Sequence, residues 1–214
     1  MQGAPIRLHL GCGEKYLERY VNVDYPPDEH SVLSPRADVY ADITELSYEP
    51  GSVGEVRLHH VFEHFDRPTA LRLLIDWYEW LEENGALVIE TPDFEAAVRR
   101  FRKRRFGRRR GTVLRHIFGS HEASWAFHAD GWYEEKFRRV LESLGYEVVG
   151  VERGSWRGTD NITVTARKPP PPWRSRDMQL DRAEELLRAS LVDESPSELK
   201  LHRVWMDSLR GSED

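Results

Sequence analysis

The feature that most constrains the fold is a pattern repeated in the first third of the chain: a short β-rich run that stops at a glycine turn or an acid. The first four such runs cover residues 6–10, 20–24, 37–42 and 55–60. Three of them lead into Gly11-Cys12-Gly13, hereafter the glycine turn, or end in Asp24 and Asp42. These are the residues expected at the carboxyl edge of a parallel sheet, where α/β folds bind their ligands. The pattern therefore predicts a parallel α/β sheet with a ligand site along one edge.

The remaining segments extend this prediction to a complete domain. Apolar residues recur at helical spacing over 67–85, and a fully buried strand, residues 86–90, follows. Further helices are expected over 94–105 and 131–144, and further strands over 146–152 and 161–168. Residues 107–130 lack clean periodicity, so the stretch from about 94 to 130 is interpreted as a basic insertion or lid. Residues 1–168 are predicted to form a Rossmann-like domain: a seven-stranded, mainly parallel sheet, its last strand antiparallel, with helices on both faces.

The C-terminal segment, residues 169–214, is expected to be an appendage. Four consecutive prolines, 169–172, end the sheet because a proline run favours an extended spacer and cannot continue strand pairing. Two amphipathic helices then follow, over 177–191 and 196–209, as a helical hairpin. A hairpin this short must pack its apolar stripe on its own domain or on another subunit. We therefore expect any homo-oligomer or protein-partner contact to use these helices.

Charge is distributed unevenly along the chain. The formal net charge is −6, which argues against a general nucleic-acid-binding protein. Between Arg99 and Arg110, hereafter the basic segment, there are nine cations and no acid. They are Arg99, Arg100, Arg102, Lys103, Arg104, Arg105, Arg108, Arg109 and Arg110. Since a cluster of this density attracts anions, we expect an anionic partner there, such as a nucleotide-linked or lipid-linked sugar or an acidic glycan.

No stretch approaches the length of about 20 apolar residues that a membrane-spanning helix needs. The N-terminus does not resemble an export signal, so a cytoplasmic protein is expected. Cys12 is the only cysteine, which excludes an internal disulfide and a multi-cysteine zinc site. Its simplest role is that of a small residue filling the turn.

The glycine turn and the two acids together predict a nucleoside site. Neither glycine carries a Cβ, so the backbone can approach a ligand closely. Asp24 is placed to accept both ribose hydroxyls, and Asp42 to meet an adenine amino group. A dinucleotide site would need G-x-G-x-x-G and an acid about 20 residues further on. Tyr16 stands where the third glycine would be, and Asp24 follows too soon, so the cofactor is expected to lack a pyrophosphate.

In this order, the segments LHLGCG, YVNVD, ADVYADITEL, EVRLHHVFEHF and GALVIETPDF resemble the class I S-adenosylmethionine-dependent methyltransferases. The resemblance covers about residues 6–168, and it is strongest to a bacterial group predicted to act in surface polysaccharide or secondary-metabolite biosynthesis. It implies S-adenosylmethionine as cofactor. It further implies that the glycine turn (Gly11, Cys12, Gly13) borders the methionine part, Asp24 the ribose, Asp42 and Ile43 the adenine, and His60 the sulfonium. His9 stands where the family often has an acid or amide, at the cofactor's amino group.

Methyl transfer by such a site is an in-line displacement in which positioning supplies most of the catalysis. If the acceptor is a hydroxyl, a general base with a pKa near neutrality helps. The candidates are His60, Glu63, His64 and His128, and the sequence does not choose among them. We expect methylation at oxygen of a sugar, glycan or other small polar acceptor, without a metal site.

Three alternatives remain open. Residues 60–64 also match H-x-x-E-H, a zinc-protease signature that needs both histidines one helical turn apart. A second alternative is an RNA or DNA methyltransferase whose basic segment grips phosphates. The third is a methyltransferase-like binding or scaffold protein without catalytic activity, which the histidine at position 9 makes credible.

Overall fold

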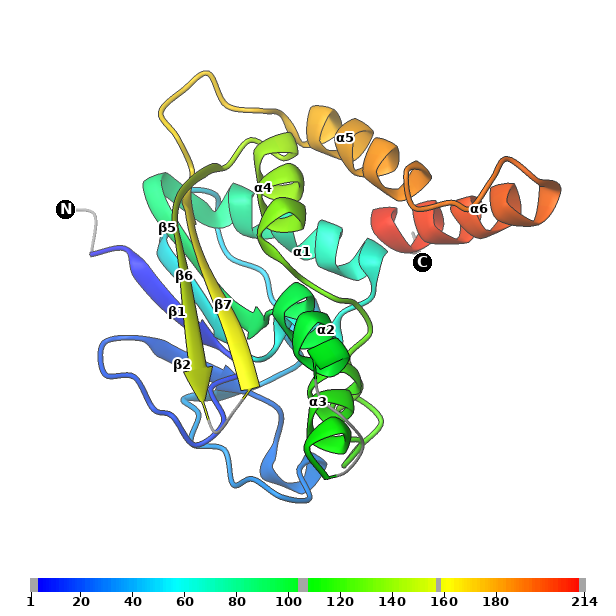
Figure 1. Ribbon diagram of the computed structural model, residues 1–214. Coiled ribbons are helices and arrows are strands. Elements are labelled where there is room, and N and C mark those ends of the chain that lie inside the picture. The colour runs from blue at the N-terminus through cyan, green and yellow to red at the C-terminus, as the bar shows by residue number, and fades with distance from the viewer. Residues whose placement is uncertain (1–3, 104–107, 157–158, 212–214) are drawn as a thin grey trace.

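The computed structural model describes residues 4–103, 108–156 and 159–211, and within them a single seven-stranded sheet in the order β3-β2-β1-β4-β5-β7-β6 (Figure 1). The strands are β1 (Ile6–Leu10), β2 (Val21–Asp24), β3 (Val39–Tyr40), β4 (Val53–His59), β5 (Leu81–Pro92), β6 (Glu147–Trp156) and β7 (Thr159–Arg167). Strand β7 runs antiparallel to both its neighbours, and the other pairings are parallel. The predicted mainly parallel sheet with an antiparallel last strand is confirmed. Because β1 lies between β2 and β4, the strand order reverses beside the glycine turn, where open α/β sheets bind ligands.

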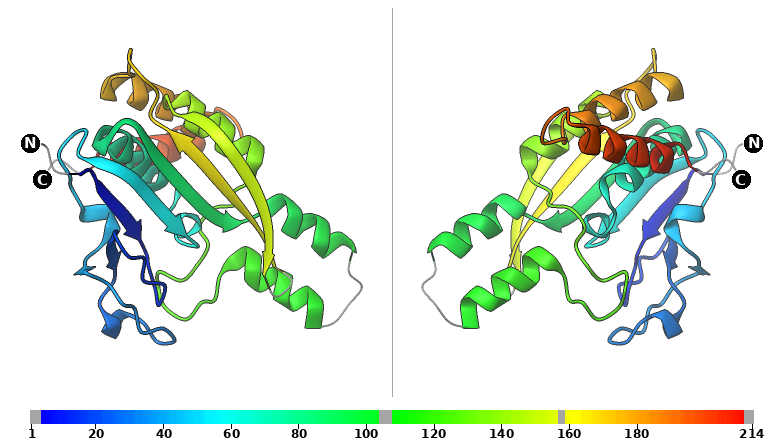
Figure 2. Two further views of the ribbon diagram at one scale, coloured as in Figure 1. Left: turned by 90° about the vertical axis from the view of Figure 1, so that its left-hand side faces the viewer. Right: turned by 90° about the vertical axis from the view of Figure 1, so that its right-hand side faces the viewer.

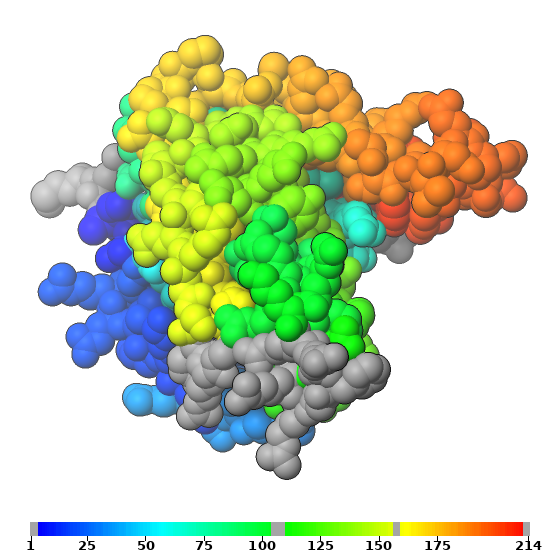
Figure 3. All heavy atoms as spheres, viewed as in Figure 1, coloured from blue at the N-terminus to red at the C-terminus, as the bar shows by residue number. Residues whose placement is uncertain are grey.

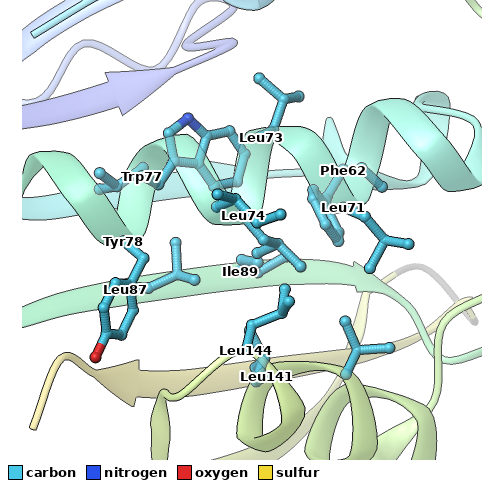
Figure 4. Packing of buried hydrophobic residues seen from close by; sticks show 14 of the residues in the cluster. Phe62, Leu71, Leu73, Leu74, Trp77, Tyr78, Leu87, Ile89, Leu141 and Leu144 are labelled. Carbon is cyan, nitrogen blue, oxygen red and sulfur yellow. The ribbon is translucent and has the colours of Figure 1, made fainter. Parts of the chain in front are cut away.

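The hydrophobic core lies between one face of the sheet and the helices α1 (Arg67–Trp80) and α4 (Glu134–Ser143). In β5, Leu87 and Ile89 point to this face, where they meet Trp77 of α1 and Leu141 of α4 (Figure 4). Helix α1 begins after Asp66, whose side chain accepts a hydrogen bond from the Thr69 amide. The core thus fixes β4 and β5, the two strands whose ends carry His60 and Glu90.

The helices are distributed unevenly, which differs from the expectation of helices on both faces. The connections before β4 contain only the 3-10 turns η1 (Pro27–Glu29) and η2 (Ile43–Glu45), because these links are too short for packed helices. Helices α1 and α4 form one layer with α5 (Arg176–Arg188) and α6 (Pro196–Arg210). The opposite face of β1, β2 and β4, hereafter the polar face, carries side chains that bond to each other. They are Arg7, His9, Tyr20, Asn22, Glu55, Arg57 and His59.

The C-terminal helices α5 (Arg176–Arg188) and α6 (Pro196–Arg210) both pack against α1. Ala183, Leu187 and Leu209 are at most 1% exposed and join the main core. Of the two expected docking places, the hairpin therefore uses its own domain. Figure 3 shows the orange and red part of this hairpin standing out from the body of the molecule. None of the described helices is long and apolar enough to span a bilayer.

The insertion after β5 is more helical than the sequence indicated. Helix α2 (Phe94–Lys103) was expected, but α3 (Arg108–Phe118) falls in the stretch interpreted as aperiodic. Its pattern is weak because Val113 is its only buried apolar residue among those described. Both helices project from the carboxyl end of the sheet (Figure 2), and residues 119–130 return from them to α4. The insertion thereby forms a wall beside the strand ends.

Candidate active site

The glycine turn and the two acids converge, as the predicted nucleoside site requires. The Gly13 amide donates to Oδ2 of Asp24 at 2.6 Å, and the Tyr25 amide donates to Oδ1 of the same side chain at 2.8 Å. The Tyr25 hydroxyl then donates to Oδ2 of Asp42 at 3.1 Å. One tyrosine therefore connects the ends of β2 and β3, and both carboxylates lie at the edge where the glycine turn lies.

The acids keep capacity for a ligand. Asp24 accepts from Gly13 and Tyr25 and lies 3.0 Å from Nε2 of His30, while Asp42 accepts from Tyr25 and from the amide and hydroxyl of Thr44. A carboxylate has about four acceptor positions, so each acid has about one left for a ribose hydroxyl or an adenine amino group. Ile43, next to Asp42, is buried and adds apolar surface. These residues fit an adenosine group.

Gly11 ties the turn to the segment after β4. Its φ is 66°, a conformation that glycine adopts without strain. A Cβ at this position would lie 2.2 Å from Cγ2 of Val61, closer than real Cβ atoms come to a neighbour. The glycine turn therefore packs directly on the residue that follows His60.

Two predicted cofactor residues have other roles. His9 is fully buried, with Nδ1 3.1 Å from Oδ1 of Asn22 and Nε2 3.2 Å from Nδ1 of His59. Because both ring nitrogens face protein groups, His9 has none left for a cofactor, and this expectation is corrected. The Cys12 thiol contacts the Arg36 carbonyl, and burial together with Asp24 raises its pKa to about 12. A thiol in this state is not a nucleophile, so Cys12 fills the turn.

A cavity of about 860 Å³ lies beside this edge, between the strand ends and the insertion. Its wall includes all four histidine and glutamate residues singled out as bases: His60, Glu63, His64 and His128. Leu33 also lines it, and lies 3.9 Å from where a Cβ on Gly13 would stand. Leu33 thus connects the cavity to the glycine turn, although the turn, Asp24 and Asp42 are not among the residues that line it. The volume of the cavity is that of a small-molecule site.

His60 is held between two carboxylates. Its Nδ1 lies 3.3 Å from Oε1 of Glu63, and its Nε2 lies 3.3 Å from Oε1 of Glu90. Burial opposes the charged ring, but the hydrogen bonds to Glu63 and Glu90 outweigh it and raise the pKa of His60 to about 9. Conversely, the hydrogen bond from His60 is the main cause that lowers the pKa of Glu90 to about 2. His60 is thus an imidazolium at neutral pH and has no lone pair with which to accept a proton.

The other candidate bases come from two segments that are bonded together. Glu63 is 2% exposed, and its backbone carbonyl accepts from the Ala129 amide at 2.8 Å. His64 Nδ1 lies 3.0 Å from the carbonyl of Phe127, and the rings of His64 and His128 meet edge to face. Burial lowers the pKa of His128, so this ring is neutral at pH 7. Histidines from residues 60–64 and 128 therefore share one wall.

The polar residues of this wall that were not predicted from the sequence include Glu90, His116 and Asn161. The Asn161 side-chain amide lies 3.0 Å from Nε2 of His60, and burial lowers the pKa of His116. Glu90 is an acid at the end of the strand predicted over residues 86–90, the same signal that identified Asp24 and Asp42, and so was open to detection. His116 and Asn161 carry no such signal, because the fold brings them from α3 and β7.

The H-x-x-E-H alternative lacks its helix. Residues Phe62–His64 form the 3-10 turn η3, and His60 precedes it with a φ of 56°. His60 and His64 are therefore not on one helical face, so the zinc-protease signature is not formed.

The basic segment lies only partly within the described residues; Arg104 and Arg105 lie outside them. Arg99 pairs with Glu95 and Arg100 with Asp160, while Arg110 lies over the ring of Phe101. Arg102 and Lys103 are exposed at the end of α2. Part of the basic segment therefore stabilises the insertion by contacts within the protein, and does not serve only to attract an anion.

No protein-family description and no curated protein sequence matches this chain. Several solved structures, however, are similar to this chain. An S-adenosylmethionine-dependent methyltransferase of Methanosarcina mazei superposes over 80% of this chain and 95% of its own, with a TM-score of 0.52 and 12% identity.

A second similar structure is the 1,6-didemethyltoxoflavin-N1-methyltransferase of Burkholderia thailandensis, solved with 1,6-didemethyltoxoflavin and S-adenosylhomocysteine. The superposition covers 78% of this chain and 72% of that one, with a TM-score of 0.51 and 14% identity. At these identities the likeness concerns the fold. The chain has the fold of the class I S-adenosylmethionine-dependent methyltransferases.

Proposed function

We propose that this protein is an S-adenosylmethionine-dependent methyltransferase that methylates an oxygen of a small polar acceptor, of the sugar or glycan class. The observation that carries the proposal is the convergence of the glycine turn, Asp24 and Asp42 beside a histidine-lined cavity. The fold and the neighbours that share it support the same donor. Polar groups of the cavity wall, among them Glu90, His116 and Asn161, support a hydroxylated acceptor.

The cofactor supplies a methyl group already activated by positive sulfur. The chain's own residues then have two tasks: to hold the acceptor oxygen in line, and to remove its proton. The protonated His60 holds the side chains of Glu63 and Glu90 at the cavity wall. A neutral ring on the same wall takes the proton, and burial keeps His116 and His128 in that form.

Calorimetric titration with S-adenosylmethionine and S-adenosylhomocysteine tests the donor. We expect one-to-one binding of both, weakened at least tenfold by Asp24→Asn. Asp28→Asn is the matched control, since Asp28 is exposed on the adjoining turn η1 and should leave the affinity unchanged. If neither compound gave binding heat, the proposal would be overturned and the scaffold alternative favoured.

We also propose that the exposed cations at the end of α2 recruit an anionic acceptor. The double variant Arg102→Glu, Lys103→Glu should raise the KM for such an acceptor and leave the cofactor affinity intact. Equal damage to both would contradict this role. RNA binding that survives moderate salt and weakens in this variant would instead favour the nucleic-acid alternative.

A further inference from the structure

We propose that Glu63, His64 and His128 form a binding site for one divalent transition-metal ion on the wall of the cavity. One ligand atom from each of these side chains lies within 4.8 Å of the other two. Two imidazoles and a carboxylate are the ligands of many catalytic Zn²⁺ sites, and they equally suit Co²⁺ and Mn²⁺. The sequence analysis expected no metal, and its zinc alternative paired His60 with His64. In the structure His128, from a distant segment, completes the set in place of His60.

The first independent observation is an unpartnered oxygen. Glu63 is 2% exposed, and its Oε1 faces Nδ1 of His60 at 3.3 Å and Nε2 of His128 at 3.9 Å. Among the described residues, no donor reaches its Oε2, although this atom is buried. Burying a charged carboxylate oxygen without a partner is costly. A cation bound beside Glu63 would remove that cost. The unpartnered oxygen is therefore evidence for a ligand at this position.

The second observation is the orientation of His64. Its Nδ1 donates to the Phe127 carbonyl at 3.0 Å, which leaves the lone pair on Nε2. Metal-binding histidines are commonly fixed in this way, by a hydrogen bond from the nitrogen that does not bind the metal. The carbonyl belongs to the residue before His128, so one contact both orients His64 and holds His128 next to it.

The backbone preassembles the site. The Glu63 carbonyl accepts from the amides of Ala129 and Asp130, and the His128 amide donates to the Phe118 carbonyl at 3.2 Å. These bonds join the segment after β4 to the end of the insertion. With metal–ligand bonds of about 2.1 Å, tetrahedral ligand atoms lie roughly 3.4 Å apart. The three ligand atoms, which lie within 4.8 Å of one another, are therefore already near this spacing.

The three side chains leave the remaining coordination positions open to the cavity that they line. A role of the ion in methyl transfer rests on the proposed function, whereas the binding of the ion does not. If an acceptor hydroxyl bound the ion, it would become more acidic. Its proton would then pass to Nδ1 of His116, whose Nε2 faces the Asp160 carbonyl at 3.0 Å. The oxygen lone pair then forms the bond to the methyl carbon, and the electron pair of the broken S–C bond stays on sulfur.

The test is metal binding by the full chain, freed of metal by chelation and titrated with CoCl₂, ZnCl₂ or MnCl₂ without cofactor or acceptor. We expect one equivalent to bind, with the visible absorption of nitrogen-ligated Co²⁺. Glu63→Gln, His64→Asn and His128→Asn should each weaken binding at least tenfold. His202→Asn is the control, because His202 lies in α6 and is not among the residues that line the cavity.

The outcomes separate the two proposals, because S-adenosylhomocysteine affinity is measured on the same samples. The metal site is overturned if His202→Asn weakens metal binding as much as the three variants do, or if the wild type binds no metal. Loss of cofactor binding alone overturns only the proposed function. Should Glu63→Gln fail to fold, the two histidine variants still decide, since both rings are partly exposed.

Discussion

His59 and His60 are neighbours in the chain, yet the structure makes one ring neutral and the other positively charged. His59 belongs to the polar face, beside His9, and burial lowers its pKa to about 4. His60 faces the cavity between Glu63 and Glu90, and its pKa is raised to about 9. Both rings are partly buried, so burial alone does not set their charge. The charge of the ring at the cavity is therefore set by the carboxylates of Glu63 and Glu90, and not by its degree of burial.

The largest expected effect comes from replacing each histidine in turn. His60→Gln removes the cation between two carboxylates and should lower kcat by about 10–100-fold, the usual effect of losing a partner that orients reacting groups. His59→Gln should keep kcat within about threefold, because its ring contacts the polar face. Steady-state kinetics with both variants checks this. Equal losses would mean that the two faces do not differ in function.

The next effect concerns the polar face alone. Glu55 accepts from Arg7, Tyr20 and Arg57, and it is 8% exposed. Glu55→Gln removes the negative charge and one of the two oxygens that the arginines share, and it should lower the free energy of unfolding by about 1–3 kcal/mol. Affinity for S-adenosylhomocysteine should not change. Urea denaturation with parallel calorimetry measures both quantities, and a change in affinity with unchanged stability would reverse the assignment of the two faces.

The dependence of stability on pH should have a different cause on each side of neutrality. An unfolded histidine has a pKa of about 6.5. Between there and about 4, the unfolded chain binds a proton that His59 does not, so stability falls as pH falls. Between about 6.5 and 9, folded His60 holds a proton that the unfolded chain lacks, so stability falls as pH rises.

After allowance for solvent exposure, we expect each contribution to be on the order of 1 kcal/mol. Urea denaturation across this range should show the acid-side slope reduced in His59→Gln and the alkaline slope reduced in His60→Gln. Slopes that are the same in both variants and the wild type would contradict the assigned charges.

The smallest expected effect is on a single pKa. Glu90→Gln removes one of the two carboxylates at His60, so the pKa of His60 should fall by roughly one unit. NMR titration of the imidazole resonances measures it. The pKa of His59 should fall slightly, because Glu90 also raises it from a distance. A larger change at His59 than at His60 would show that the two rings have been assigned to the wrong faces.

The sequence was sufficient for those parts of the site that lie at strand ends. The glycine turn, Asp24 and Asp42 follow short β-rich runs, and parallel pairing places such ends together. The lack of a helix between β1 and β2 was also accessible, since too few residues separate the glycine turn from Asp24 for a helix to form. Local pattern predicts these features because neighbouring residues determine them.

The partners of His60 could not be predicted in the same way. Strand alternation indicates that His59 and His60 point apart, but the charge of each ring depends on what lies opposite. Glu90 and Asn161 reach His60 only through the pairing of β4, β5 and β7. The prediction for His9 was wrong for the same reason. Its partners Asn22 and His59 come from two other strands, so its position near the glycine turn did not indicate its contacts.

The contact between Gly11 and Val61 has a consequence for how such a protein changes during evolution. Any side chain at position 11 must push Val61, and with it the turn that carries His60, Glu63 and His64. On the proposed function, donor affinity and acceptor choice are therefore coupled through the side chain of Val61. New acceptor preferences should arise by replacement of residues in the insertion wall, such as Thr112 or Arg115, which line the cavity and leave the contact at Gly11 intact.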